Sequence, residues 1–282
     1  MKDFWTNLQL FFGKHFATYK LFRLKTYANL KYGMASQGMD MIDNRYIVQG
    51  SDNENENASF VIFDIVKKKL IAEFQFEFPS HINNINIGGY LNDTSSWPLL
   101  YISECRCQHR CFVVNVRNDL SGFDIIQTFM FNSEKHYSGS RNSFDWFVDT
   151  KNNFIYTLGN SGKKNEIEIC KFLLPTQRWI TRTFIDNEVI DSFLLSCNTF
   201  QGSKVIDDNL YVLNGIDTKD NPTQLQIIDL YGKILKDGKP VLADQFTIKG
   251  LGEIEAIGKY DRGFIIENCA YNPTYYYLKI KK

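Results

Sequence analysis

Polar residues of the kinds that bind ligands or transfer protons recur at the start of five short, strand-like segments. The predicted ligand-binding residues are Gln37, Asp40, His81, Asn83, Asp145, Trp146, Gln201, Glu253 and Glu255. Carboxylates held together in one cavity raise each other's pKa, which provides a general acid near neutral pH. The same oxygen-rich groups suit a hard cation such as calcium. A wet channel lined by polar side chains, without any ligand, is the third interpretation.

His81 has the most specific chemistry among these residues. It follows Pro79-Ser80 and precedes Ile82, so we expect it on a loop or at the start of a strand. The sequence assigns no Ser–His–Asp triad. It also lacks a phosphate-binding glycine loop, because Gly88-Gly89 and the glycines at 250–252 have neither the required spacing nor a following helix.

Three of the six cysteines crowd into seven residues, Cys105-Arg-Cys-Gln-His-Arg-Cys111. Cys105, Cys107, His109 and Cys111 are candidate zinc ligands, since thiolate and imidazole are the usual ligands of that ion. A disulfide between Cys105 and Cys111 is an alternative. Free thiols at the end of a strand are the favoured interpretation, because the paired C-x-x-C spacing of zinc sites is missing.

Composition excludes several classes of protein. The 282 residues carry 32 Lys and Arg against 32 Asp and Glu, and a neutral chain lacks the positive field that binds nucleic acid. With 44% apolar residues the chain is not disordered. No apolar run approaches the roughly 20 residues of a membrane helix. Leu8 to Phe12 are followed closely by Lys14 and His15, so we expect a helical or irregular tail over residues 1–18 and no signal peptide.

A repeat organises the rest of the chain. Tyr46, Tyr101, Tyr156 and Tyr211 lie 55 residues apart, and Ile266 follows after the same interval. Each anchor comes after a turn, and short β-rich runs flank it on both sides. The runs that precede the anchors are residues 38–42, 83–87, 144–148, 202–206 and 253–257. We expect outer strands at residues 70–76, 124–131, 178–184 and 243–248, which leaves the fifth unit without one.

Residues 19–26 alternate apolar and basic side chains, as a half-solvated outer strand does. Pairing this strand with the last unit removes two open sheet edges. The sequence therefore predicts an all-β, five-bladed β-propeller over residues 19–282. The expected blades are residues 33–77, 78–132, 140–185, 190–248 and 249–282, the last completed by strand 19–26. A β-sandwich is the alternative, because short strands at regular spacing also fit that fold.

Five segments resemble a group of uncharacterised bacterial β-propeller proteins. They are residues 37–40 (Gln-Gly-Met-Asp), 81–84 (His-Ile-Asn-Asn), 98–104, 200–202 and 252–256, which with the strands between them span most of residues 33–282. That group typically occurs as exported or lipid-anchored proteins. The resemblance therefore implies a periplasmic or cell-surface location.

Two segments are similar to glutamine cyclotransferases, which are also five-bladed propellers. Ser36-Gln-Gly-Met39 is similar to the Thr-Gln-Gly-Leu of their first blade, and Glu253-Ile-Glu255 to a late Glu-x-Glu segment. Where that family carries a Glu-Gly pair with the catalytic acid, this chain has Asn83-Asn84. Of the tryptophan-rich pocket of that family, only Trp146 has a counterpart near a blade entry in this chain.

The first strands of a propeller line a central channel, so the predicted residues converge on one mouth. We expect a binding module for a small ligand, a peptide or a glycan, and the sequence assigns no cofactor. An enzyme, either cyclotransferase-like or a lyase or hydrolase that uses Asp40, His81, Asp145 and Glu255, is one alternative. A protein-interaction scaffold is the other. Replacing Asp40 or His81 with Ala is expected to abolish binding with little loss of stability.

Overall fold

The computed structural model describes residues 11–12, 16–23, 35–104, 108–137, 144–268 and 274–280. Within these ranges the chain is all-β, with 20 strands and one 3₁₀ helix, η2 (Asp186–Glu188). The abundance of aromatic and β-branched residues in short runs favours strands. No helix in these ranges is long and apolar enough to cross a membrane.

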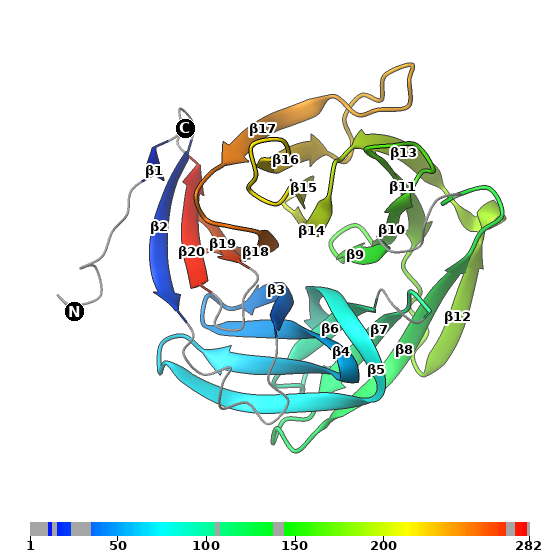
Figure 1. Ribbon diagram of the computed structural model, residues 1–282. Helices are drawn as coiled ribbons and strands as arrows, with labels where there is room; N and C mark the ends of the chain where they lie inside the picture. The colour runs from blue at the N-terminus through cyan, green and yellow to red at the C-terminus, as the bar shows by residue number, and fades with distance from the viewer. Residues whose placement is uncertain are drawn as a thin grey trace.

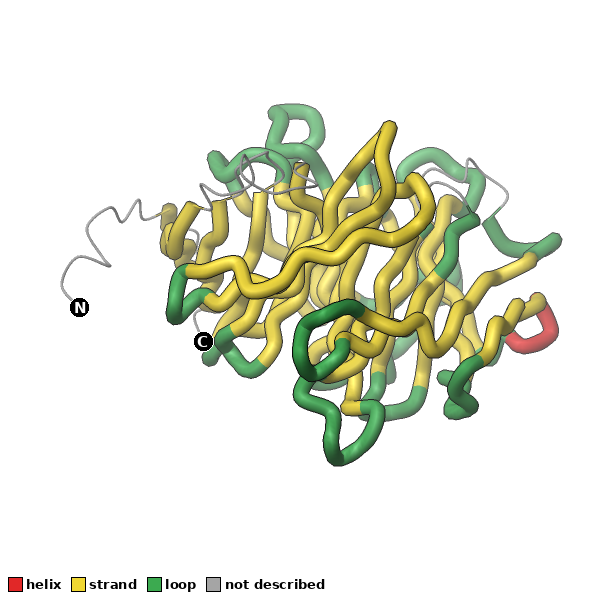
Figure 2. The backbone as a smooth tube through the Cα atoms, turned by 90° about the horizontal axis from the view of Figure 1, so that it is seen from below, coloured by secondary structure: helices red, strands yellow, loops and turns green. Residues whose placement is uncertain are grey.

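The strands form four sheets that stand around a common centre (Figure 1). Seen from the side, the strands run between two faces that carry the loops (Figure 2). This propeller-like arrangement agrees with the expected fold class. The sheets have five, four, seven and four strands, so the number of blades does not follow from the number of sheets.

The seven-stranded sheet has the order β12-β8-β7-β6-β5-β4-β3. Its first strands are β3 (Ala35–Ile42), β4 (Tyr46–Asp64), β5 (Lys69–Tyr90), β6 (Pro98–Glu104), β7 (Cys111–Val116) and β8 (Phe123–Asn132). The two halves of β5 have different partners: residues 69–81 pair with β4, and residues 82–90 pair with β6.

The long strand β4 folds back on itself as a hairpin. Its two ends lie side by side, because the Ile65 amide donates to the Arg45 carbonyl at 3.0 Å and the Ser51 hydroxyl donates to the Ser59 carbonyl at 2.9 Å. An apolar cluster that includes Phe60, Phe74 and Phe112 fills the space between β4–β5 and β6–β7. The seven-stranded sheet is therefore bent, and its two parts pack face to face.

The next two sheets have four strands each. One contains β9 (Asp145–Asp149), β10 (Phe154–Asn160), β11 (Glu166–Leu173) and β13 (Asp191–Ser196), and the other β14 (Phe200–Ile206), β15 (Asn209–Asn214), β16 (Thr223–Asp229) and β17 (Leu242–Ile248). Both are antiparallel throughout.

One strand joins a different sheet from the one expected. The segment at residues 178–184 was predicted as the outer strand of the third repeat, but β12 (Ile180–Ile185) pairs in parallel with β8, and β13 takes the outer position beside β11. Phe184 lies there in a buried cluster with Phe129 and Phe172. Periodicity shows that a strand forms but not which neighbouring sheet it extends.

The five-stranded sheet joins the two ends of the described chain. Its order is β1 (Phe11–Phe12), β2 (Phe16–Arg23), β20 (Thr274–Ile280), β19 (Gly263–Asn268) and β18 (Ile254–Tyr260). Tyr19 pairs with Tyr277, which confirms the predicted pairing of the N-terminal strand; residues 24–26 lie outside the described ranges. Residues 11–12 and 16–18 belong to strands, not to the expected helical or irregular tail. Phe11 pairs with Thr18 and Phe12 with Ala17, and residues 16–18 also pair with β20. The other residues of 1–18 lie outside the described ranges.

Two hairpin turns explain why the repeat begins with Asp and Asn. Asp43 and Asn44 both have positive φ (50° and 53°), and so do Asp207 and Asp208 (49° and 67°). The turn at residues 207–208 joins Ile206 to Asn209 with two residues, and the turn at residues 43–45 joins Ile42 to Tyr46 with three. Asn and Asp tolerate the positive φ that both turns contain. Each turn thus connects the strand nearest the centre to the next one outward.

Candidate functional site

Five inner strands approach the centre: β3, residues 82–90 of β5, β9, β14 and β18 (Figure 1). We call the end at which these strands begin the mouth, defined by Gln37, His81, Asn83, Gln201 and Glu253. His81 Nε2 lies 2.9 Å from Gln37 Oε1, and Gln201 Nε2 donates to Glu253 Oε1 at 2.6 Å. His81, Asn83 and Glu253 are half-buried, while Gln37 and Gln201 are buried behind them. Each of these two contacts therefore joins predicted residues from two neighbouring repeats.

A second group of polar residues lies deeper between the inner strands. We call Asp40, Asn84, Asp145, Ser203 and Lys204 the central network. Lys204 Nζ lies 3.0 Å from Asp40 Oδ2, and both residues are less than 10% exposed. Lys204 also donates to the Ile85 carbonyl, so one ammonium group connects three inner strands. Burial lowers the pKa of Lys204, and the Asp40 carboxylate opposes that shift.

Asp40 has further partners that leave little of its carboxylate free. The amides of Met41 and Ile87 donate to it at 2.8 and 2.7 Å. Charge-assisted hydrogen bonds of this kind hold a carboxylate in one orientation. Asp40 therefore fixes the spacing of β3 and β5 around the centre.

Asp145 is completely buried on β9. Asn84 Nδ2 donates to Asp145 Oδ2 at 3.0 Å and to the Ser203 carbonyl at 2.9 Å, and the Trp146 amide donates to Asp145 Oδ1 at 2.7 Å. Burial raises the pKa of Asp145 to about 7, although hydrogen bonds from Ser103, Trp146 and Asn84 and the charge of Lys204 favour the ionised form. This carboxyl group is thus half-protonated near neutral pH while solvent does not reach it.

Backbone packing closes the centre at this depth. A Cβ atom added at Gly38 would lie 2.4 Å from the Asn84 Cα, and one added at Gly202 would lie 2.5 Å from the Glu255 carbonyl oxygen. Only glycine fits where two backbones approach so closely. The central network fills what remains, so Asp40 and Asp145 are shielded from solvent.

A further buried polar group lies between β18–β20 and β3–β4. The Ser36 hydroxyl donates to Glu267 Oε1, and the Tyr275 hydroxyl donates to Gln49 Oε1 at 2.8 Å. Burial, together with the neighbouring Glu255, raises the pKa of Glu267 well above its usual value. Glu267 therefore serves as part of the packing between two sheets.

Besides Asp40 and Asp145, two more predicted ligand-binding residues, Trp146 and Glu255, lie away from the mouth. Trp146 is 1% exposed among the aromatic side chains between β7–β8 and β9–β11, and its Nε1 donates to the His109 carbonyl at 2.7 Å. The buried Glu255 lies with its backbone against Gly202. Neither side chain offers a surface to a ligand in this structure.

The candidate zinc ligands at residues 105–111 are only partly described. Cys105 and Cys107 lie outside the described ranges. His109 packs against the Phe144 ring, with 5.1 Å between ring centres. Cys111 is a free thiol buried in the same apolar cluster, where burial raises its pKa well above the usual value.

Lys204, Glu267 and Ser103 were missed from the sequence as parts of a site. Lys204 sits in the predicted inner strand at residues 202–206, where a charged side chain in a buried strand is itself a signal, because such charges need a partner. Gln49, Glu104 and Glu267 each lie three residues after an aromatic side chain (Tyr46, Tyr101 and Phe264). Aligning the repeats on these aromatics identifies the polar position.

Comparison with known proteins shows likeness of fold alone. No model of a protein family matches the chain, and no curated protein matches it in sequence. The tail fiber of Staphylococcus aureus phage P68 is similar with a TM-score of 0.50 and 14% identity over 89% of this chain, which spans about half (52%) of that fiber chain. The Dos1 propeller (TM-score 0.41, 8% identity, 86% of this chain and 68% of that one) also matches. So does hydrazine synthase of Kuenenia stuttgartiensis (TM-score 0.43, 10% identity, 82% and 61%).

The match to the phage tail fiber, at a TM-score of 0.50, shows a likeness of fold and nothing further. The comparisons identify no sequence family, so the resemblances to exported bacterial propellers and to glutamine cyclotransferases remain predictions, as does an exported location.

Proposed function

We propose that this chain is a five-bladed β-propeller that binds a small polar ligand, a peptide or a glycan at its mouth. The propeller-like fold indicates a binding or scaffold role, because such a fold brings distant parts of the chain to one end of a common centre. The residues at the mouth supply the chemistry.

Two observations support the count of five blades. The seven-stranded sheet divides within β5, whose halves pair with β4 and with β6. In the described residues there are also five buried apolar clusters, each between neighbouring groups of strands around the ring. Five clusters between neighbours support a closed ring of five units.

The observation that carries the binding proposal is the contrast in exposure along the inner strands. His81, Asn83 and Glu253 are half-buried at the mouth, directly above a central network that is buried and fully engaged. A rigid base with partly exposed polar groups is preorganised, so a ligand loses little free energy in ordering it. Carboxylate, amide and imidazole groups match ligands that present hydroxyl or ammonium groups.

Catalysis by Asp40, His81, Asp145 and Glu255 has less support. A general acid or base must come within hydrogen-bond reach of the substrate. Asp40, Asp145 and Glu255 are buried, and His81 faces Gln37. A scaffold role on the outer surface is the remaining alternative.

The test is a thermal-shift screen of the purified chain against a panel of neutral and amino sugars, their short oligomers and tripeptides. We expect at least one compound to raise the melting temperature. The variants His81→Ala and Glu253→Gln should then weaken its binding more than about tenfold, because each removes one polar contact worth roughly 1–2 kcal/mol. Asp207→Asn, at the turn on the opposite end of β14, is the control and should bind normally. A panel without any binder, or equal binding by all three variants, would favour the scaffold.

A further inference from the structure

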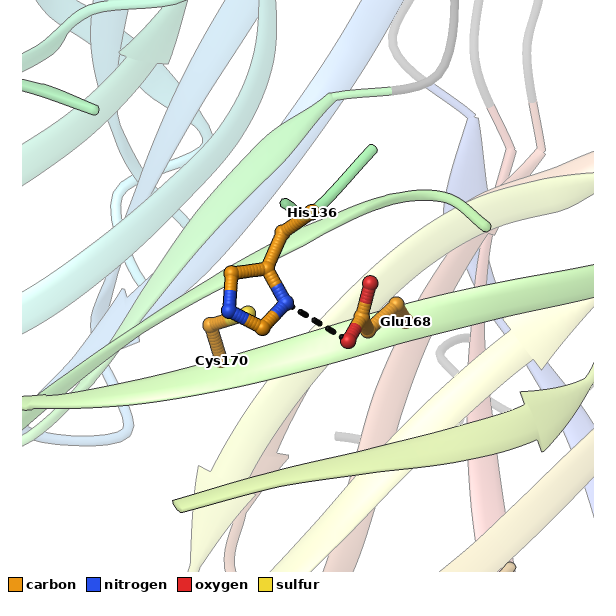
Figure 3. A group of neighbouring side chains, drawn as sticks. All are labelled: His136, Glu168 and Cys170. Carbon is orange, nitrogen blue, oxygen red and sulfur yellow. Dashed lines mark hydrogen bonds and ion pairs between the residues drawn. The ribbon is translucent and has the colours of Figure 1, made fainter. Parts of the chain in front are cut away.

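We propose that His136, Glu168 and Cys170 form a zinc-binding site on the outer part of the sheet that contains β11. The three side chains converge there (Figure 3), and none of them belongs to the mouth or to the central network. Glu168 and Cys170 lie on β11, and His136 lies in the segment that follows β8.

The distances suit a metal ion. Glu168 and Cys170 are two residues apart on one strand, so their side chains point to the same face. One ligand atom from each of the three residues lies within 4.8 Å of the others. Zinc bonds of 2.0–2.3 Å in tetrahedral geometry place donor atoms roughly 3.3–3.7 Å apart. Small rotations of His136 and Glu168 are enough to reach that spacing.

The segment that carries His136 is held in place on both sides. The Ser133 hydroxyl accepts a hydrogen bond from the His136 amide at 2.7 Å and donates to Asp186 Oδ1 at 2.5 Å. Tyr137 has a left-handed backbone (φ 60°) and packs on Gly159, where an added Cβ would lie 2.4 Å from the tyrosine ring. Metal ligands need such fixed supports, since their partners set affinity.

The local charge favours a cation. His136 Nδ1 lies 2.7 Å from Glu168 Oε1, and these two side chains are 17% and 16% exposed, while Cys170 is fully buried. Among the described residues no lysine or arginine forms an ion pair with Glu168. Asp186 adds a second negative charge near His136. A divalent ion would replace the hydrogen bond between imidazole and carboxylate and neutralise this charge.

The chemical types of the three ligand atoms favour zinc over calcium and magnesium. One nitrogen, one oxygen and one sulfur ligand are typical of zinc, whereas calcium and magnesium take oxygen ligands alone. Asp186 is already engaged by Ser133 and by the Glu134 amide at 3.1 Å. Three protein ligands therefore leave the fourth position to water.

The experiment uses the full chain after dialysis against a chelator. Zinc chloride is titrated calorimetrically, and bound metal is counted by elemental analysis after gel filtration. We expect one zinc per chain with micromolar or tighter affinity. His136→Gln and Glu168→Gln, which preserve size at partly exposed positions, should each lower affinity by at least 100-fold, beyond what loss of a supporting residue costs. Glu134→Gln, an exposed glutamate in the same segment, is the matched control and should bind zinc normally.

Two further variants separate this site from the cysteine cluster at residues 105–111. With cobalt in place of zinc, a thiolate-to-metal absorption band should appear in the wild type and disappear in Cys170→Ala. It should persist in a Cys105→Ser, Cys107→Ser double variant and in Cys197→Ala, another buried cysteine. The proposal is overturned if the wild type retains no zinc, if both glutamine variants bind normally, or if binding is lost only in the double variant. Any of those results would leave His136 and Glu168 as a hydrogen-bonded pair beside a packed thiol.

Discussion

The central network and the mouth contain the same kinds of side chain, yet they differ in burial. Asp40 and Lys204 are buried and paired at 3.0 Å, whereas His81 and Glu253 are half-buried. A buried ion pair contributes little net stability, but removing one partner is costly because the other charge remains buried. Residue type alone therefore does not mark a binding residue; access to solvent does.

The comparison changes what the sequence led us to expect for Asp40. It was grouped with His81 as a residue whose loss abolishes binding and spares stability. In the structure Asp40 accepts hydrogen bonds from the amides of Met41 and Ile87 and pairs with Lys204; the contacts with Ile87 and Lys204 join β3 to other inner strands. We now expect its replacement to act on the fold first.

The largest effect is predicted for Lys204→Met. This change leaves the Asp40 carboxylate buried without its ion-pair partner, so the free energy of unfolding should fall by about 3–5 kcal/mol. Urea unfolding at pH 7, followed by tryptophan fluorescence, measures the change. The double variant Asp40→Asn, Lys204→Met removes both charges and should recover most of the loss. A loss below about 1 kcal/mol in the single variant would mean that water reaches the centre.

A comparable effect, spread over pH, is predicted for Asp145. Burial raises its pKa to about 7 in the folded chain, against roughly 3.9 when unfolded. Between these values the folded chain keeps the proton and the unfolded chain releases it. The free energy of unfolding should therefore fall as pH rises from 4 to 7, by up to about 4 kcal/mol from this group, and then level off.

The variant Asp145→Asn isolates that contribution. Urea unfolding of the variant and the wild type at several pH values between 4.5 and 8 gives the difference in stability. We expect the variant to gain relative to the wild type as pH rises. A difference that does not change with pH would show that Asp145 is ionised throughout and sits in a more polar surrounding.

The smallest effect on stability is predicted at the mouth. His81→Ala removes one hydrogen bond to Gln37, so the free energy of unfolding should change by about 1 kcal/mol or less. Differential scanning calorimetry checks this. A loss as large as that of Lys204→Met would place His81 in the structural framework and remove the distinction between the two regions.

Much of the fold could be predicted from the repeat. The anchors Tyr46, Tyr101, Tyr156 and Tyr211 all lie on second strands, and the pairing of Tyr19 with Tyr277 was expected from an unpaired last unit. These features depend on local patterns and on the need to cover sheet edges. The sheet joined by β12 was not predictable, because it depends on where Phe184 is buried among aromatic side chains from three strands.

Part of the candidate site follows from the repeat. Gln37 contacts His81 and Gln201 contacts Glu253, because the residues of each pair lie near the start of neighbouring inner strands. Whether a polar residue is half-buried at the mouth or fully buried depends on its position along the strand. That burial depends on packing such as that of Gly38 against Asn84. The grouping of His136 with Glu168 and Cys170 joins segments more than 30 residues apart, and no local motif announces it.

The pairing of β2 with β20 also has a consequence for how the molecule is made. During synthesis Tyr19 leaves the ribosome long before Tyr277, so β2 cannot pair with β20 until nearly the whole chain has been made. Contacts of such long range slow folding. Ring closure should then be a late event, and hydrogen exchange during refolding should protect the amides of β10 and β15 before those of β2.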